Sequence, residues 1–563
     1  MGPLLLHDTH DTHSDCAGSL LKRDSLPNMM LVSAMSTNDL FQSAAEGEQM
    51  GAEVQDKPVD VPNEPQDHHS VSSSFRPNRT LTWECTMEPD ESKVVFFPEK
   101  HAISQVERLA EFVDRAHFEC LGSETLEQLK IRILDSLGCG IGALGSEPPG
   151  MIKRYIDEFH DQGCCTLIGG GTADVDRAAL YNSALIRYLD FNDSFLAKGE
   201  TCHPSDNLGA ILAAGESAGS TGQDLMTALA VAYQIQCRLS ELAPVRARGF
   251  DHTVQGAYAV AAGISRVLGL DPVQTANAIA ISGTAFNALR VTRTGKLSHW
   301  KGLAYPNLAA CCLRVVLLAR EGVTGPLEVI EGEKGLMDAI TGYFEISWDD
   351  EDLGLVRRTT VKKYNAEIHS QTAIEAVLTL RQRYQFTWKD IDRVRVGIFD
   401  VAYNIIGGGE EGDKKVVSTK EQADHSLPYV LAVALIDGRV MPEQYTPERI
   451  QREDVQTLLR AISVDPSPSF SKRFPKEMPC RVEITLKDGR VVQQETSDYE
   501  GFFTRPMSWE TAVQKFNQLA APNASQGQRV SIVETVAHLE QVSVRELMKQ
   551  LGAVRHVPGR QES

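Results

Sequence analysis

Residues 178–219 read AALYNSALIRYLDFNDSFLAKGETCHPSDNLGAILAAGESAG, and this stretch points to the architecture of most of the chain. Two apolar runs with helical spacing enclose a turn-rich polar segment, LDFNDSFLAKGETCHPSDN, at 189–207. Asp190 and Asp193 follow the first run, and His203 precedes the second. Acid/base side chains at two helix ends can converge on a cleft, although such residues also cap helices without any further role.

The same helical texture extends over residues 101–345, where alanine-rich runs carry small residues at which helices can approach closely. Thr221 and Asp224 match a capping box ahead of an apolar face. The Asp-Pro pair at 271–272 begins another helix directly after Gly269, which is typical of a helix end. The pattern predicts a helical bundle.

The pattern changes after Trp348. The segment RVRVGIF at 393–399 alternates like a strand, and RVEITLKDGRVVQQE at 481–495 is typical of a hairpin with an Asp-Gly turn. The run YNAEIHSQTAIEAVLTLRQRY at 364–384 has the period of a helix. Helices packed on an antiparallel sheet would make this region a smaller α+β domain.

A helical period returns near the C-terminus, which indicates that the α+β part is inserted into the helical part. We therefore predict a mainly α fold, with a large all-helical domain built from residues 99–345 and 504–552 and an inserted α+β lid domain at 346–503. Residues 1–98 are rich in His, Asp, Ser, Pro and Asn without a sustained apolar period, so we expect a disordered tail. Residues 553–563 form a second tail.

The composition limits the classes of partner. With 563 residues, the chain can bury more than one hydrophobic core. Its 56 Lys and Arg against 76 Asp and Glu give a formal charge of -20, which disfavours nucleic acids and anionic membrane surfaces. No uninterrupted apolar run of about 18 residues occurs, so the sequence predicts no membrane-spanning helix.

The 11 cysteines include no pair separated by two residues, so the ligand spacing of zinc and iron–sulfur sites is missing. We therefore expect a site without metal or cofactor. Cysteines scattered through apolar helical segments are typical of reduced, buried thiols. This favours an intracellular protein of the cytoplasm, with the mitochondrion as the alternative.

The segment RVTRTGKLSHWK at 290–301 carries several cations and no acid. Dense positive charge at the end of an apolar helix suits a substrate with several carboxylates, because each carboxylate needs charge-assisted hydrogen bonds to leave water. A solvated basic face would have the same composition. The candidate anion contacts in this segment are Arg293, Lys296 and Lys301.

A second cationic group precedes Tyr364, and there Lys362 and His369 are further candidate substrate contacts. A phenol can donate a proton to a leaving oxygen and take one back, although a tyrosine beside an apolar helix is also a common core residue. His252 directly precedes a Gly- and Ala-rich helix. Its ordinary pKa lies near neutral pH, which suits acid/base work, while its position also suits a helix cap.

Several segments of the chain resemble the MmgE/PrpD family and occur in that family's order. They are DSLGCGIGALGS at 135–146, LDFNDSFL at 189–196, CHPSDNLGAILA at 202–213, GFDHTVQGAYAVAAGISRVLGL at 249–270, GKLSHWKGLAYPN at 295–307, VKKYNAEIHSQTAIEA at 361–376 and ADHSLPYVLAVAL at 423–435. The resemblance implies a homodimeric lyase acting on a tricarboxylic acid, since the family includes 2-methylcitrate dehydratases and cis-aconitate decarboxylases. It places Asp190 or its near neighbours, His203, His252, Lys296 and Tyr364 around the pocket, with Lys301 as the alternative lysine.

The sequence thus predicts a cofactor-independent lyase that dehydrates 2-methylcitrate or a related 2-alkylcitrate by acid/base elimination. Decarboxylation of cis-aconitate to itaconate is the alternative, and a catalytically silent metabolite-binding or scaffold homologue is the alternative of another class. The predicted catalytic residues are Asp190, Asp193, His203, His252 and Tyr364, and the predicted substrate-binding residues are Arg293, Lys296, Lys301, Lys362 and His369. We expect Asp190→Asn or His203→Ala to abolish turnover with little change in thermal stability.

Overall fold

The computed structural model describes residues 102–159, 163–295 and 297–556, all of which belong to one contact unit spanning 96–563. The predicted N-terminal tail, most of the predicted C-terminal tail and Lys296 lie outside the described residues.

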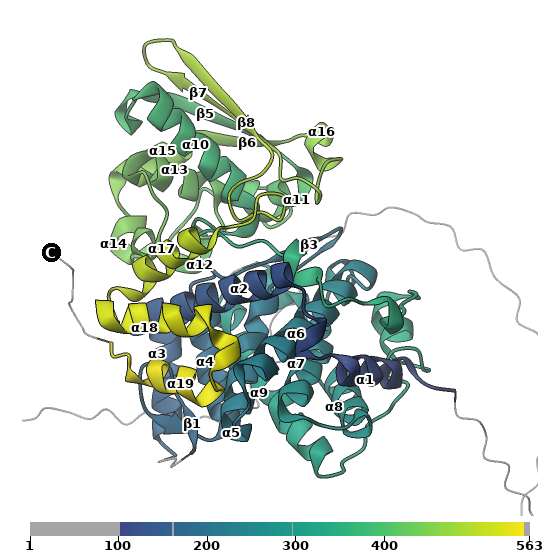
Figure 1. The fold of residues 1–563 in the computed structure, drawn as a ribbon. Helices are drawn as coiled ribbons and strands as arrows, with labels where there is room; N and C mark the ends of the chain where they lie inside the picture. The colour runs from purple at the N-terminus through teal and green to yellow at the C-terminus, as the bar shows by residue number, and fades with distance from the viewer. Residues whose placement is uncertain (1–101, 160–162, 296, 557–563) are drawn as a thin grey trace, which may run out of the picture. The chain divides into compact units, whose positions relative to one another are not determined.

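The first half of the described chain is helical (Figure 1). Its helices are α1 (Gln105–Arg115), α2 (Ser123–Gly142), α3 (Glu147–Asp157), α4 (Val175–Tyr188), α5 (Leu208–Ala218), α6 (Gly222–Leu242), α7 (Thr253–Leu268), α8 (Pro272–Ala285) and α9 (Trp300–Arg320). The predicted helix boundaries are confirmed, because Thr221 and Asp224 form the capping box of α6 and Asp271 caps α8. Gly269 ends α7 with a φ of 67°, a left-handed conformation that favours glycine.

These helices pack around a shared core. The α6 and α7 helices lie against each other, and α4 packs between α5 and α9. Buried residues from most of these helices, such as Leu185, Ile211, Tyr233 and Leu313, belong to one hydrophobic cluster. The polar segments between the helices are therefore placed at the ends of a rigid bundle.

The α9 helix is apolar enough to be considered as a membrane span. By length and composition it could cross a bilayer, with a mean hydropathy of 1.6 over its most apolar window. However, 61% of that window is buried inside the protein, where α9 packs on α4, α7 and α8. A buried core helix passes the same test, so within the described chain this single helix is weak evidence for a membrane span.

The polar segment at 189–207 contains more regular structure than the sequence predicts. It forms an antiparallel hairpin of β3 (Phe195–Ala197) and β4 (Glu200–Cys202), followed by a short 3-10 helix, η2 (Pro204–Asn207). A second short hairpin, β1 (Cys165–Thr166) with β2 (Thr172–Ala173), precedes α4.

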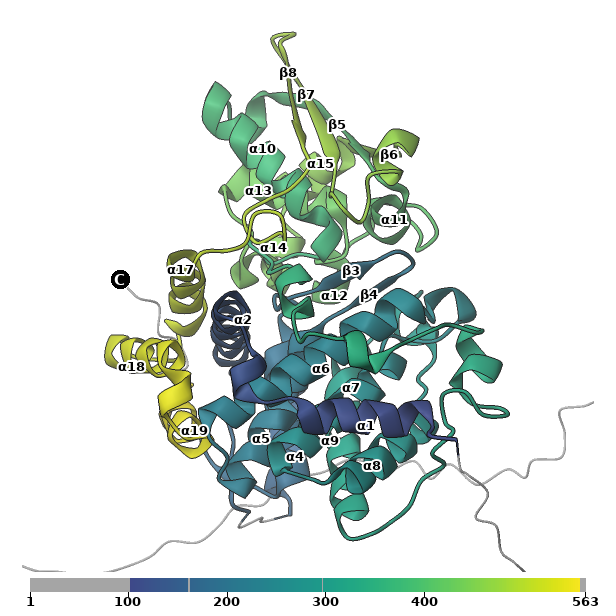
Figure 2. The same cartoon turned by 45° about the vertical axis from the view of Figure 1, so that its right-hand side comes forward.

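The α+β part contains a four-stranded sheet with the order β6-β5-β7-β8 (Figures 1 and 2). The strands are β5 (Ile391–Ile398), β6 (Ile462–Pro466), β7 (Cys480–Leu486) and β8 (Val491–Thr496). The predicted strand and hairpin are confirmed, but the prediction of a purely antiparallel sheet is wrong. The sequence reading missed β6, which pairs with β5 in parallel, with Val394 opposite Ile462.

Helices accompany this sheet. They are α10 (Gln371–Tyr384), α11 (Asp400–Ala402), α12 (Lys420–Ala423), α13 (Leu427–Asp437), α14 (Pro447–Ile450), α15 (Glu453–Arg460) and α16 (Pro468–Ser471). The α10 helix packs on β7, β8 and α13. The helix predicted at 364–384 begins only at Gln371, after a short 3-10 helix, η8 (Ile368–Ser370).

The last three helices return to the helical part. They are α17 (Trp509–Ala520), α18 (Gln526–Ala537) and α19 (Val544–Ala553). The α17 and α18 helices pack on α2, and α19 packs on α5. Lys515 on α17 donates to the carbonyl oxygens of Phe191 and Lys362 at 2.7 and 2.8 Å and pairs with Asp135 at 2.6 Å. One ammonium therefore connects four distant segments of a mainly α fold.

Candidate active site

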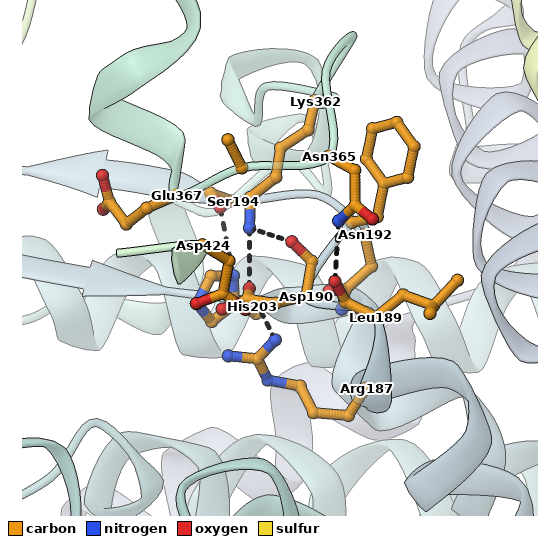
Figure 3. Close-up of polar contacts among 12 residues, drawn as sticks. Arg187, Leu189, Asp190, Asn192, Ser194, His203, Lys362, Asn365, Glu367 and Asp424 are labelled. Carbon is orange, nitrogen blue, oxygen red and sulfur yellow. Dashed lines mark hydrogen bonds and ion pairs between the residues drawn. The ribbon is translucent and has the colours of Figure 1, made fainter. Parts of the chain in front are cut away.

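The centre of the candidate site is Asp190, in the segment that follows α4. This residue has a φ of 53°, a left-handed conformation that is uncommon for a residue with a side chain. Lys362 fixes it by donating to both its carbonyl oxygen (2.6 Å) and its carboxylate (2.7 Å). The amide of Asn365 holds the preceding carbonyl of Leu189 at 2.8 Å. The α+β part thus clamps the backbone where α4 ends (Figure 3).

Three cations share the carboxylate of Asp190. Arg187 and Lys362 each contact Oδ1 at 2.7 Å, and Lys301 contacts Oδ2 at 3.0 Å. Burial alone would raise the pKa of Asp190, but the charges of Arg187, Lys362 and Lys301 outweigh it and hold that pKa well below its ordinary value. Asp190 is therefore a permanent anion that orders the cations around it, and it is poorly suited to accept a proton.

His203 lies next to this ionic centre. Its Nδ1 is 2.8 Å from the backbone carbonyl of Asp193 and 3.0 Å from the hydroxyl of Ser194. Because a carbonyl only accepts, Nδ1 carries the hydrogen and the neutral ring has its lone pair on Nε2. Burial and the charges of Arg187 and Lys362 hold the pKa of His203 well below its ordinary value. In the free protein His203 is thus a neutral ring that can accept a proton.

His252 packs on His203 edge to face, with ring centroids 5.5 Å apart, and lies over the ring of Tyr305. Neither of its ring nitrogens has a hydrogen-bond partner among the described residues. Burial is the main reason that its pKa falls to about 3. The neighbouring Asp251 carboxylate contacts the guanidinium of Arg293 at 2.5 Å. The position before α7 therefore provides a buried, neutral imidazole with unused polar atoms.

His369, in η8, belongs to a buried acid–imidazole pair. Its Nδ1 is 2.6 Å from Glu367, whose carboxylate also accepts the backbone N–H of His369 at 2.8 Å. Burial opposes ionisation of Glu367, but the imidazole outweighs it and lowers the carboxyl pKa to about 2. The buried Nε2 of His369 has no partner among the described residues. This pair resembles a proton donor held in orientation by a carboxylate.

One group of side chains has the composition of a cation site. Asp190, Asp424 and His425 each place a ligand atom within 4.8 Å of the others. The ammonium of Lys301 lies between them, at 3.0 Å from Asp190, 3.6 Å from Asp424 and 3.2 Å from Nδ1 of His425. Lysine therefore supplies the positive charge at this point, and a metal ion bound there would have to displace it.

These groups line one pocket of about 570 Å³. The pocket is lined by six cations (Arg187, Arg246, Arg290, Arg293, Lys301 and Lys362), four carboxylates (Asp190, Glu200, Glu367 and Glu411), four histidines (His203, His252, His369 and His425), Thr201, Leu297, Ile368 and Ile405. Cations exceed carboxylates by two when the histidines are neutral. This lining suits a small organic molecule with several negative charges.

Two family models match this chain. Residues 107–349 match the MmgE/PrpD N-terminal domain, and residues 364–541 match the MmgE/PrpD C-terminal domain. The chain belongs to the MmgE/PrpD family. The resemblance seen in the sequence is thereby confirmed, and the mainly α fold with an α+β part agrees with it.

The similar proteins carry the names of two activities, 2-methylcitrate dehydratase and cis-aconitate decarboxylase. The chain is 28% identical over 402 residues to "2-methylcitrate dehydratase, mitochondrial" of Yarrowia lipolytica, covering 67% of this chain and 76% of the relative. It is 30% identical over 382 residues to "2-methylcitrate dehydratase" of Salmonella typhi, covering 61% and 74%. Against "Cis-aconitate decarboxylase" of Mus musculus it is 24% identical over 441 residues, covering 74% and 86%.

Most of the residues that the sequence predicts for the site line one pocket. The pocket is lined by Asp190, His203, His252, Arg293, Lys301, Lys362 and His369. Of the two candidate lysines, Lys301 lines the pocket and Lys296 lies outside the described residues.

Neither Asp193 nor Tyr364 lines this pocket, although the backbone carbonyl of Asp193 contacts His203. The carboxylate of Asp193 accepts from the hydroxyl of Tyr233 at 2.7 Å and from the N–H of Ser205 at 3.1 Å, which matches the capping role that the sequence left open. The hydroxyl of Tyr364 donates to Glu375 at 2.5 Å and lines a different pocket. The carboxylate of Asp193 and the hydroxyl of Tyr364 are therefore engaged by partners outside the pocket lining.

The sequence reading of this MmgE/PrpD chain also missed several pocket residues. Arg187, Arg246, Glu367 and Glu411 were not selected. Arg187 carried a usable signal, because it is the one charge in the apolar run ALYNSALIRYL ahead of Asp190. Glu411 lies in a Gly-rich polar loop that looks like an ordinary surface connection.

Proposed function

We propose that the protein is a lyase that dehydrates 2-methylcitrate or a closely related 2-alkylcitrate without a cofactor. The observation that carries this proposal is the pocket that combines His203, the His369–Glu367 pair and six cations. The relatives named 2-methylcitrate dehydratase support the same substrate class. None of the described cysteines lines the pocket, and the proposal assigns the elimination to proton transfer by side chains.

In the proposed reaction, His203 is the base. Its Nε2 takes the proton from the carbon next to a carboxylate, and that C–H electron pair becomes the new carbon–carbon double bond. The pKa of His203 is low in the free protein, but a bound tricarboxylate would raise it because negative charge nearby stabilises the protonated ring. Substrate binding would thereby activate the base.

His369 is the acid in this scheme. When protonated, it donates from Nε2 to the leaving hydroxide, which departs as water with the electron pair of the broken C–O bond. Glu367 at 2.6 Å stabilises the protonated ring and fixes its orientation. Arg246, Arg290 and Arg293 would hold the substrate carboxylates and stabilise enediolate charge in the transition state. The two histidines are restored by proton exchange with water.

A substrate panel tests this proposal. Purified protein is incubated with 2-methylcitrate, citrate or cis-aconitate, while ultraviolet absorbance follows the new double bond and a coupled assay follows CO2. We expect 2-methylcitrate to give an unsaturated tricarboxylate without CO2. Release of CO2 from cis-aconitate would favour the decarboxylase, which the mouse relative and the same cation set also support. No turnover by a folded sample would favour the silent binding protein.

We also propose that residues 346–503 act as a lid domain and that the protein is a homodimer inside the cell. The lid proposal is supported by Lys362, which reaches from this region to Asp190. Light scattering tests the dimer, with an expected mass of about twice the 61.9 kDa chain. Fluorescent tagging of the full chain tests the compartment.

A further inference from the structure

Glu411 bridges the two parts of the structure at the edge of the candidate pocket. It lies between a short π-helical turn, η10 (Tyr403–Gly407), and α12 in the α+β part. Its carboxylate contacts Arg246 at 3.4 Å and Arg290 at 3.5 Å, and both arginines belong to the helical part. Lys414 follows at 3.9 Å.

These residues separate the inner pocket from a larger outer cleft. The outer cleft, of about 1320 Å³, shares five lining residues with the inner pocket: Glu200, Thr201, Arg246, Arg290 and Glu411. The ion pairs of Glu411 are therefore located where the two spaces meet. Anything that passes from the outer cleft to the histidines must pass these charges.

The contacts of Glu411 are longer than the tightest ion pairs around the pocket. Asp251 holds Arg293 at 2.5 Å and Asp190 holds Lys362 at 2.7 Å, whereas both contacts of Glu411 to arginine exceed 3.3 Å. The side chain of Glu411 is 13% exposed, so water reaches it. Long contacts through a single carboxylate oxygen hold the two guanidinium groups less firmly than a bidentate carboxylate would, so a better-placed anion can replace Glu411.

We propose that Glu411 is an internal substitute for a substrate carboxylate: it occupies Arg246 and Arg290 in the free protein and is displaced when a tricarboxylate binds. This inference rests on the proposed substrate class. The incoming carboxylate would make bidentate contacts with the two guanidinium groups, which Glu411 does not make here. An anion that enters the pocket would thus have to compete with Glu411 for the two arginines, which lowers its apparent affinity.

The segment that carries Glu411 is built to move. Residues 407–409 are consecutive glycines, and Gly408 and Gly412 have φ values of 112° and 87° with open space where a Cβ would be. The backbone N–H of Glu411 donates to the carbonyl of Asn404 in the adjacent η10 turn. Rotation of the Glu411 side chain alone would displace the carboxylate, with this backbone contact left in place.

The test measures binding rather than turnover. Propane-1,2,3-tricarboxylate has no hydroxyl group to eliminate, so isothermal titration calorimetry can follow its binding to the wild-type chain and to Glu411→Gln. We expect the variant to bind roughly three- to fivefold more tightly, because the competing charge is gone. Glu410→Gln is the matched control, because Glu410 lines the outer cleft but forms no ion pair among the described residues. This variant should bind propane-1,2,3-tricarboxylate with the affinity of the wild-type chain.

Two further variants keep the inference open to refutation. Glu411→Asp keeps the charge but shortens the reach to the arginines, so it should also bind more tightly. In an Arg246→Gln background, Glu411→Gln should gain less than it does in the wild-type chain. Equal or weaker binding by both Glu411 variants would overturn the inference, and circular dichroism would verify their folding. Failure of the proposed dehydration alone would leave this binding result unaffected.

Discussion

Replacing Asp190 with asparagine should lower the stability of the protein much more than the sequence suggests. The sequence predicts a loss of activity with little change in stability, but the structure places this carboxylate between Arg187, Lys301 and Lys362. Its side chain is 6% exposed, and those of the three cations are 5% exposed or less. Asparagine cannot neutralise three buried charges.

The size of the effect follows from the burial of these charges. Removing one partner of a buried ion pair costs about 3–5 kcal/mol, because the remaining charge stays desolvated. For Asp190→Asn we expect about 4 kcal/mol and a fall in Tm of at least about 5 °C. Thermal melting and urea unfolding, followed by circular dichroism, measure both quantities.

A matched control separates this effect from the loss of a surface ion pair. Asp157 contacts Lys153 at 2.5 Å, but its side chain is 58% exposed. Asp157→Asn should therefore cost less than about 1 kcal/mol. If Asp190→Asn melts within a degree or two of this control, the three cations do not depend on Asp190 and the reasoning fails.

Three other variants test the site. His203→Gln should lower kcat by about 10²–10⁴-fold without a large fall in Tm, and a rate close to wild type would remove His203 as the base. Tyr364→Phe should leave kcat within about twofold, because its hydroxyl contacts Glu375 away from the histidines; a loss of about a hundredfold in a steady-state assay would return Tyr364 to the catalytic set. The pKa of His252 is lowered from 6.5 to about 3 in the folded protein, so between these pH values the unfolded chain binds one more proton than the folded chain. The free energy of unfolding should therefore fall as the pH drops through that window, by up to about 1.4 kcal/mol per pH unit. In His252→Gln, urea unfolding between pH 4.5 and 6.5 should show a shallower slope, and an unchanged slope would contradict the assignment.

The sequence predicted the helical bundle well because its signals are local. Capping boxes, the Gly269 helix end and the apolar period each depend on a few neighbouring residues. The missed strand β6 has the sequence ISVDP, which contains too few apolar residues to stand out. Its place in the sheet depends on pairing with β5, a contact between residues far apart in the chain.

The orientation of Tyr364 shows why part of the site could not be predicted. The side chain of Gln371 accepts the N–H groups of Lys363 and Tyr364 at 3.0 and 2.9 Å, so the segment before α10 is a turn. This turn directs the tyrosine toward Glu375. The hydrophobic period alone suggested a continuous helix and could not indicate this bend. Similarly, the grouping of charges around Asp190 depends on segments more than 100 residues apart.

The contacts of Lys515 have a consequence for biosynthesis. This residue on α17 holds the backbone carbonyl of Phe191, which follows Asp190, and that of Lys362, a lysine partner of Asp190. When the ribosome has translated the histidines and arginines of the pocket, α17 is still to be made. The first helices of the bundle can therefore form early, but the bundle and the pocket reach their final geometry only after α17 has emerged from the exit tunnel.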